Sequence, residues 1–213
     1  MIYEDMRIKL VEMLKYEGRI KTKQVEKAFL EIPRENFVPD EIKKYAYADT
    51  PLQIGNGQTI SAPHMVAIMV EELDLKMGQK ILEIGAGSGY HAAIVSKIVG
   101  KKGHVYTIER FPSLAEVSKK NLEKIGIINV TVEIGDGSEG LQKYAPYDRI
   151  YVTCAAPDVP KPLIEQLKDG GKLMIPVGRT ICDLELIEKK GDKLKYKDLG
   201  GCAFVPLVGK YGY

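Results

Sequence analysis

The chain has 213 residues, of which 45% are hydrophobic and 28% charged, and its formal net charge at pH 7 is +2. This length suits one α/β domain with a full core and a small appendage, and a charge so close to balance carries no electrostatic footprint of a nucleic-acid partner. No apolar run is long enough for a membrane span and the charged, amphipathic start does not look like an export signal, so we expect a cytoplasmic protein without a membrane partner.

Two amphipathic helices are expected at the start of the chain. Residues 3–17 place their apolar side chains on one helical face, and Gly18 ends that helix. Thr22 is placed to cap a second helix, which Pro33 stops. We expect residues 1–44 to form a helical appendage that covers the main sheet, within a single domain over residues 1–213.

Residues 45–62 show no sustained hydrophobic period and are rich in Gly, Pro and small polar residues, which predicts a loop. A loop of this length in a compact domain is usually functional or disordered, and its scattered apolar residues argue against disorder. A helix follows, with Ser61 just before it and Pro63 in its first turn. Ser61 is a candidate N-cap and equally a candidate functional serine. The two roles are compatible, because a helix start also presents free N–H groups to an anion.

A glycine turn organises the middle of the chain. Residues 80–84 form a short apolar run typical of a buried strand, Gly85, Gly87 and Gly89 follow at alternate positions, and an apolar helical pattern comes next. Glycines allow a tight turn and the close approach of a ligand to the main chain. With Glu83 two residues before the first glycine, the spacing differs from the G-x-G-x-x-G of dinucleotide folds. It resembles motif I of Rossmann-like S-adenosylmethionine (SAM) methyltransferases.

Strands and helices then alternate. This order predicts a parallel, doubly wound sheet with right-handed crossovers, and the alternating pattern after Leu184 predicts an antiparallel hairpin at its edge. The expected strands are residues 104–109, 129–134, 148–154, 172–177 and 193–199, and the expected helices are residues 112–125 and 162–168.

Acidic residues lie where consecutive expected strands end. Glu109 ends the second strand and Asp136 follows the third, and ligands of such sheets bind beyond the carboxyl ends of the strands. Glu109 could accept from both ribose hydroxyls, and Asp136 from an adenine amino group beside Gly137. Taken singly, Glu109 is a little-buried strand end and Asp136 a turn former. Together with the glycine turn they predict an adenosine cofactor.

Several alternatives follow from the same residues. NAD would also use an acid at the end of the second strand, but the glycine spacing and the acid after the third strand favour SAM. A fold that binds SAM without turnover stays open. A serine nucleophile has no recognisable Ser-His-Asp set, and His64 is interpreted as a support of the loop. The three cysteines lack metal-ligand spacing and no acidic cluster suggests magnesium, so we expect buried thiols and no metal.

Longer motifs make the resemblance specific. Residues 49–65 read D-x-P-L-x-I-G-x-G-Q-T-I-S-x-P-H-M, and this run resembles the protein-L-isoaspartate (D-aspartate) O-methyltransferase family. So do residues 135–141, residues 145–150 and residues 205–207, and the similarity covers essentially the whole chain. Leu141 departs from the aromatic residue or valine usual in the family, at a position expected to serve packing.

The resemblance implies a protein repair methyltransferase. It would transfer the methyl group of S-adenosyl-L-methionine to the free α-carboxylate of L-isoaspartyl residues in damaged proteins and peptides, with D-aspartyl residues as a second candidate substrate, and release S-adenosyl-L-homocysteine. The implied fold is a doubly wound Rossmann-like SAM-dependent methyltransferase sheet with an antiparallel edge hairpin and an N-terminal helical appendage, and we expect a monomer.

The resemblance also assigns roles to residues. Ser61 would be the active-site residue, because a carboxylate already ionised at neutral pH needs orientation rather than a base. Ser61, Thr59, Val205, Pro206 and Leu207 would bind the substrate. The residues expected to bind the cofactor are Gln58, Thr59, Ile60, Glu83, Gly85, Gly87, Gly89, Glu109, Arg110, Asp136 and Gly137.

Overall fold

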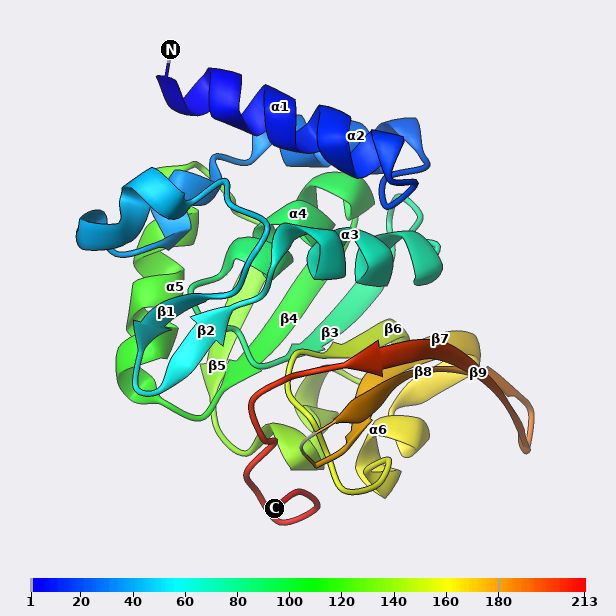
Figure 1. Cartoon of the computed structure of the whole chain (residues 1–213). Helices are drawn as coiled ribbons and strands as arrows, with labels where there is room; N and C mark the ends of the chain where they lie inside the picture. The colour runs from blue at the N-terminus through cyan, green and yellow to red at the C-terminus, as the bar shows by residue number, and fades with distance from the viewer. Residues whose placement is uncertain (1, 180) are drawn as a thin grey trace.

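A seven-stranded sheet forms the centre of the protein, whose computed structural model describes residues 2–179 and 181–213 (Figure 1). The strand order is β5-β4-β3-β6-β7-β8-β9, with parallel pairing from β5 to β7 and antiparallel pairing from β7 to β9. The expected parallel sheet with an antiparallel edge is therefore confirmed. The strands are β3 (Lys80–Ile84), β4 (His104–Glu109), β5 (Val130–Ile134), β6 (Tyr147–Val152), β7 (Leu167–Gly178), β8 (Cys182–Lys190) and β9 (Lys193–Cys202).

Alternate residues of the central strands enter two separate hydrophobic layers, because successive side chains of a strand point to opposite faces. On β3, Ile81 packs with α3 (Pro63–Glu72), α4 (Tyr90–Val99) and α5 (Pro112–Lys124). Leu82 and Ile84 pack on the other face, which carries Leu163 of α6 (Lys161–Glu165). Both faces of the central strands are therefore covered by packed side chains.

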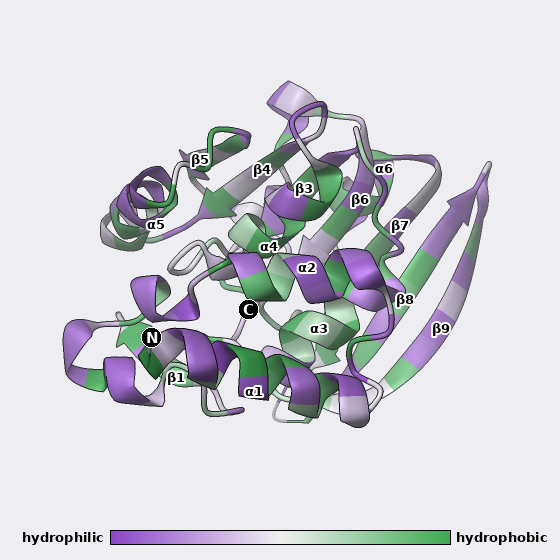
Figure 2. Cartoon of the chain, turned by 90° about the horizontal axis from the view of Figure 1, so that it is seen from above, coloured by the Kyte–Doolittle hydropathy of each residue, from purple (hydrophilic) through white to green (hydrophobic). Residues whose placement is uncertain are grey.

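The first two helices form an outer layer over α3 and α4 (Figure 1). The expectation that they cover the sheet itself was therefore wrong, because α3 and α4 lie between them and the strands. These outer helices are α1 (Ile2–Tyr16) and α2 (Lys23–Glu31), and the Thr22 hydroxyl accepts from the Val25 N–H, which confirms the expected cap. Figure 2 shows hydrophilic and hydrophobic residues mixed along α1 and α2, whereas α3 is mostly hydrophobic. In the described part of the chain, no helix has both the length and the apolar character needed to cross a membrane.

The expected loop over residues 45–62 contains a β-hairpin, so that prediction was wrong in part. A 3-10 helix (η2, Asp40–Tyr45) leads to β1 (Leu52–Gly55), which pairs antiparallel with β2 (Gln58–Ile60). Asn56 and Gly57 form the turn with φ angles of 50° and 68°. Asn-Gly in this left-handed conformation is the preferred two-residue hairpin turn. The Asn-Gly dipeptide predicts a hairpin, but the two strands are too short to show an alternating hydrophobic pattern.

The N-cap of α3 is Ala62, so the expectation that Ser61 could cap this helix was wrong. Pro63 occupies the first helical position as expected, and Ser61 lies one residue outside the helix. Its hydroxyl is therefore not committed to the end of the helix.

Candidate active site

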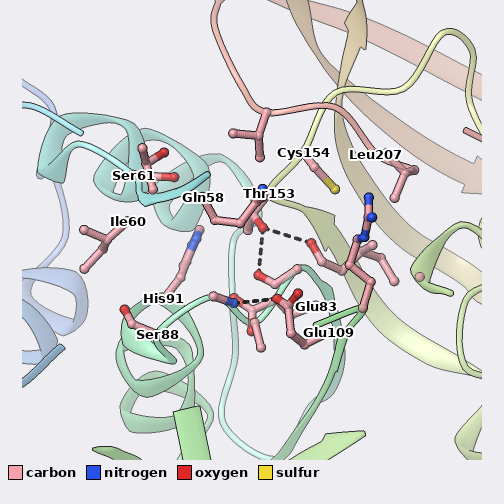
Figure 3. Close-up of a pocket in the computed structure, with 18 of the residues that line it drawn as sticks. Gln58, Ile60, Ser61, Glu83, Ser88, His91, Glu109, Thr153, Cys154 and Leu207 are labelled. Carbon is pink, nitrogen blue, oxygen red and sulfur yellow. Dashed lines mark hydrogen bonds between the residues drawn. The ribbon is translucent and has the colours of Figure 1, made fainter. Parts of the chain in front are cut away.

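A pocket of about 770 Å³, including its mouth, opens at the carboxyl ends of β3, β4 and β6 (Figure 3). Figure 3 shows Ser61 and Gln58 on the opposite side of the pocket from Glu83 and Glu109. The expected site residues that line it are Gln58, Thr59, Ile60, Ser61, Glu83, Gly85, Gly87, Glu109, Arg110, Gly137, Val205, Pro206 and Leu207.

The glycine turn leaves β3 with φ angles of 95°, 52° and 92° at Gly85, Gly87 and Gly89. A Cβ on Gly85 would lie 2.4 Å from the Thr153 Oγ1, whose hydroxyl donates to the Gly85 carbonyl. A Cβ on Gly89 would lie 2.6 Å from Ser118 Oγ on α5, and Gly89 is not among the lining residues. Packing within the protein therefore requires two of the three glycines, in addition to any ligand.

Glu109 is buried, with an exposed fraction of 5%, so the expectation of a little-buried strand end was wrong. Its Oε2 accepts from the Gly87 N–H at 3.0 Å, and its Oε1 accepts from the Phe111 N–H at 3.0 Å. The carboxylate thus ties the glycine turn to the start of α5. Each oxygen keeps a further acceptor position, which suits the pair of hydroxyls of a ribose.

Glu83 lies in a buried polar row across three central strands. Thr107 and Tyr151 are its register partners on β4 and β6, and His91 of α4 packs on Tyr151 with ring centroids 4.4 Å apart. Neither carboxyl oxygen of Glu83 has a hydrogen-bond partner in the described residues. Burial raises the pKa of Glu83 to about 8, although the hydroxyls of Thr107 and Tyr151 oppose the shift, and burial lowers the pKa of His91 to about 3. His91 is therefore neutral near pH 7, and burial favours the protonated form of Glu83.

The lining of the pocket fits a cationic adenosine compound such as SAM. Glu83 and Glu109 are its two acidic residues, and Arg110 is its only Arg or Lys and is exposed. The unpartnered oxygens of Glu83 can receive a positive charge, and a cation beside them would favour the ionised carboxylate. Ile84 and Ile108 supply the apolar surface that a flat base requires.

Two neighbouring residues in the turn after β5 have different roles: Gly137 lines the pocket, and Asp136 makes hydrogen bonds within the protein. A Cβ on Gly137 would meet Ile84 Cγ2 at 2.4 Å. Asp136 is not among the lining residues: its Oδ1 accepts from the N–H and hydroxyl of Ser138, and its Oδ2 accepts from the Lys210 N–H at 2.8 Å. Burial raises the pKa of Asp136, but these donors outweigh it and the net shift is downward. Adenine recognition by Asp136 stays a prediction.

The C-terminal segment reaches the pocket by pairing with the chain after β6. The Ala155 N–H donates to the Val205 carbonyl at 2.8 Å, and the Leu207 N–H donates to the Ala155 carbonyl at 2.7 Å. Pro206 lies between these two bonds. Residues more than 100 positions after the glycine turn are thereby placed on the same pocket.

The helix start next to Ser61 offers no N–H group to an anion, contrary to the sequence-based expectation. Pro63 has none, and the His64 N–H donates to Asp49 Oδ1 at 2.8 Å. The next two N–H groups of α3 donate to the Ala62 carbonyl. The His64 ring also contacts both Asp49 oxygens at 3.0 Å, which fits its interpretation as a support of the segment.

Some pocket residues were missed from the sequence. Thr153 and Cys154 directly follow β6, so the strand-end argument applied to the fourth strand would have found them. Tyr90 and His91 belong to the first turn of α4, after the glycines. Across residues 2–179 and 181–213, no cluster of three or more His, Cys, Asp or Glu side chains is placed to hold a metal ion.

Known proteins with similar sequences and structures agree on one family. A sequence model described as protein-L-isoaspartate(D-aspartate) O-methyltransferase (PCMT) matches residues 5–212. The protein-L-isoaspartate O-methyltransferase of Methanococcus aeolicus is 58% identical over 196 residues, which cover 92% of this chain and 91% of that protein.

Two solved structures are also similar. One is described as a protein-L-isoaspartate O-methyltransferase and gives a TM-score of 0.89 at 36% identity, over 97% of this chain and 67% of that chain. The other, from Plasmodium falciparum, is described as a putative protein-L-isoaspartate O-methyltransferase in complex with S-adenosyl-L-homocysteine. It gives a TM-score of 0.84 at 28% identity, over 94% of this chain and 97% of that chain.

Proposed function

The chain belongs to the protein-L-isoaspartate(D-aspartate) O-methyltransferase family and is a SAM-dependent repair enzyme, and we propose that Ser61 orients its substrate. The substrate is a damaged protein or peptide that contains an isoaspartyl residue. The transferred methyl group goes to the free α-carboxylate of that residue. The active-site segment would be residues 45–62, which end at Ser61.

One observation carries this assignment. Ser61, the glycine turn and Glu109 line the same pocket although they come from three separate stretches of the chain. Ser61 is half-buried there and does not cap α3. A hydroxyl at the pocket wall, opposite the two acids, is therefore available to a second ligand.

One group of pocket residues would bind SAM, and a second group would bind the substrate. Bound SAM supplies a methyl group on a sulfonium, which leaves as a neutral thioether. Glu109 would accept from the ribose hydroxyls, Gly85, Gly87 and Gly137 would let the ligand approach the backbone, and Glu83 would face the positive charge. Arg110 would lie at the rim, where its guanidinium covers the Phe111 ring.

The substrate side of the pocket needs no general base. A carboxylate is ionised at neutral pH, so catalysis consists of holding one oxygen in line with the methyl group and excluding water. The Ser61 hydroxyl would donate to the other oxygen. Gln58, Thr59 and Ile60 of β2 would touch both ligands, and Val205, Pro206 and Leu207 would bound the substrate side.

Transfer of labelled methyl groups tests this function. We expect the protein to methylate an isoaspartyl peptide and to leave the matched aspartyl peptide unlabelled. Binding of SAM without labelling of the isoaspartyl peptide would contradict the proposal. A D-aspartyl peptide in the same assay tests the second candidate substrate.

The remaining parts of the proposal concern the whole protein. We place it in the cytoplasm, as a monomer that has no nucleic-acid or membrane partner. Sedimentation equilibrium at micromolar concentration checks the monomer, and a dimer would contradict it.

A further inference from the structure

A buried arginine joins both ends of the active-site segment. Arg34 begins the 3-10 helix η1 (Arg34–Phe37) and has an exposed fraction of 0%. Its Nε donates to the Ala46 carbonyl at 2.8 Å, and its Nη2 donates to the Ser61 carbonyl at 2.8 Å. One guanidinium therefore spans the segment from its first turn to the proposed active-site serine.

The same guanidinium contacts the helix that follows the glycine turn. Its central carbon lies 4.8 Å from the centroid of the Tyr90 ring, and Tyr90 lines the pocket. Burial lowers the pKa of Arg34, while Tyr90 and more distant acidic groups oppose the shift. An arginine stays protonated in proteins, so a buried cation holds the segment against α4.

Neighbouring contacts strengthen this connection. Glu35 accepts a hydrogen bond from the Tyr47 hydroxyl, and Phe37 packs edge-on against Tyr90 with ring centroids 5.5 Å apart. Arg34, Glu35 and Phe37 of η1 thus each contact the active-site segment or the start of α4. Residues 1–44 were expected only to cover the sheet, and these contacts give their last part a connection to the pocket.

We propose that Arg34 is a positioning residue for methyl transfer, which fixes Ser61 by holding the carbonyls of Ala46 and Ser61 against α4. The inference rests on the proposed role of Ser61. A planar fork is needed because two carbonyl groups must be reached while the group lies on an aromatic ring, and lysine has a single ammonium that cannot do this. Without the fork, the buried Ala46 carbonyl and the partly buried Ser61 carbonyl lose a donor, and the segment can relax.

A double-mutant cycle between Arg34 and Ser61 tests the inference. Arg34→Lys should lower kcat for an isoaspartyl peptide by about 10–100-fold, because small misplacements of a reacting group have effects of this size. Its affinity for S-adenosyl-L-homocysteine should fall by a smaller factor than kcat, because the glycine turn and Glu109 remain and only the contacts of β2 with the cofactor are loosened. In a Ser61→Ala background, Arg34→Lys should cause almost no further loss of kcat, because its effect passes through the serine.

Arg149 provides a matched control. It is also buried, and it donates to the carbonyls of Leu73 and Asp148 at 2.7 Å, away from the pocket residues. Arg149→Lys should lower the melting temperature while kcat stays within about twofold of wild type below the melting range, as expected for distant, independent sites.

The outcomes separate the inference from the proposed function. A normal kcat in Ser61→Ala would overturn the role of Ser61 itself. An impaired Ser61→Ala beside an Arg34→Lys that behaves like Arg149→Lys would overturn the role of Arg34, and so would multiplicative losses in the double variant. If Arg34→Lys does not fold, Arg34→Gln, which keeps a neutral N–H donor, takes its place in the same cycle.

Discussion

At the scale of single residues, Ser61 has one proposed role, because capping belongs to Ala62. Ser61→Ala should lower turnover of an isoaspartyl peptide by about one to three orders of magnitude, as when one positioned donor is removed. Ser61→Cys should stay impaired, since a thiol is a weak donor. Steady-state methylation beside a thermal melt checks both. A variant with a normal rate and a lowered melting temperature would make Ser61 structural.

Glu109 combines a binding role with a structural one. Glu109→Ala should weaken SAM binding by about 1.5–3 kcal/mol if the carboxylate accepts from the ribose. It should also lower the free energy of unfolding, because the Gly87 and Phe111 N–H groups lose their acceptor. Titration calorimetry and denaturant unfolding measure the two effects. Loss of stability with unchanged SAM affinity would leave Glu109 as a support of the turn.

At the scale of elements, Asp136 joins the turn after β5 to the C-terminal segment through the Lys210 N–H. Asp136→Ala should release the last residues and speed their removal by carboxypeptidase. If Asp136 also recognises adenine, the variant should discriminate less between SAM and its hypoxanthine analogue, because an unpaired acceptor no longer rejects the analogue. Faster cleavage with unchanged discrimination would restrict Asp136 to its structural role.

At the scale of the whole molecule, one sheet carries both hydrophobic layers, and we propose that residues 1–213 form a single domain. Two buried titratable groups then affect its stability in opposite directions. The pKa of Glu83 is raised by folding to about 8, so the folded state binds its proton more tightly and stability falls as pH rises towards 8. The pKa of His91 is lowered to about 3, so the unfolded state binds the proton more tightly and stability falls as pH falls below the unfolded value of 6.5. Above pH 6.5, His91 is neutral in both states and does not change stability.

Between pH 6.5 and 8, Glu83 alone of this pair therefore lowers stability, by up to about 1.4 kcal/mol per pH unit. Glu83→Gln keeps the shape of the side chain and removes its titration. We expect the free energy of unfolding of the variant to fall less steeply than that of wild type over this window. Urea unfolding at pH 6.5, 7.2 and 8 measures the slopes. Parallel slopes would show that Glu83 does not titrate there.

The sequence by itself determined the order and type of nearly all helices and strands, the parallel sheet and most of the pocket lining. The elements, the glycine turn, Glu109 and Gly137 depend on local signals: hydrophobic period, glycine spacing, and residues at strand ends, which the topology of a parallel sheet brings to one edge. The family resemblance, and not these signals, assigned the remaining expected pocket residues, which lie in residues 58–61, at Arg110 and in residues 205–207. The hairpin of residues 52–60 was missed although its Asn-Gly turn is local, because each strand is too short for a period.

Only the tertiary structure decided what each polar side chain is bonded to. Arg34 reaches the Ser61 carbonyl across 27 residues, and Asp136 reaches Lys210 across 74. The burial of Glu109 follows from the packing of the glycine turn beside β4, and the placement of Pro206 follows from pairing with Ala155. A hydrogen bond requires donor and acceptor within about 3 Å. Distances between remote residues are fixed by packing and not by any local period of the sequence.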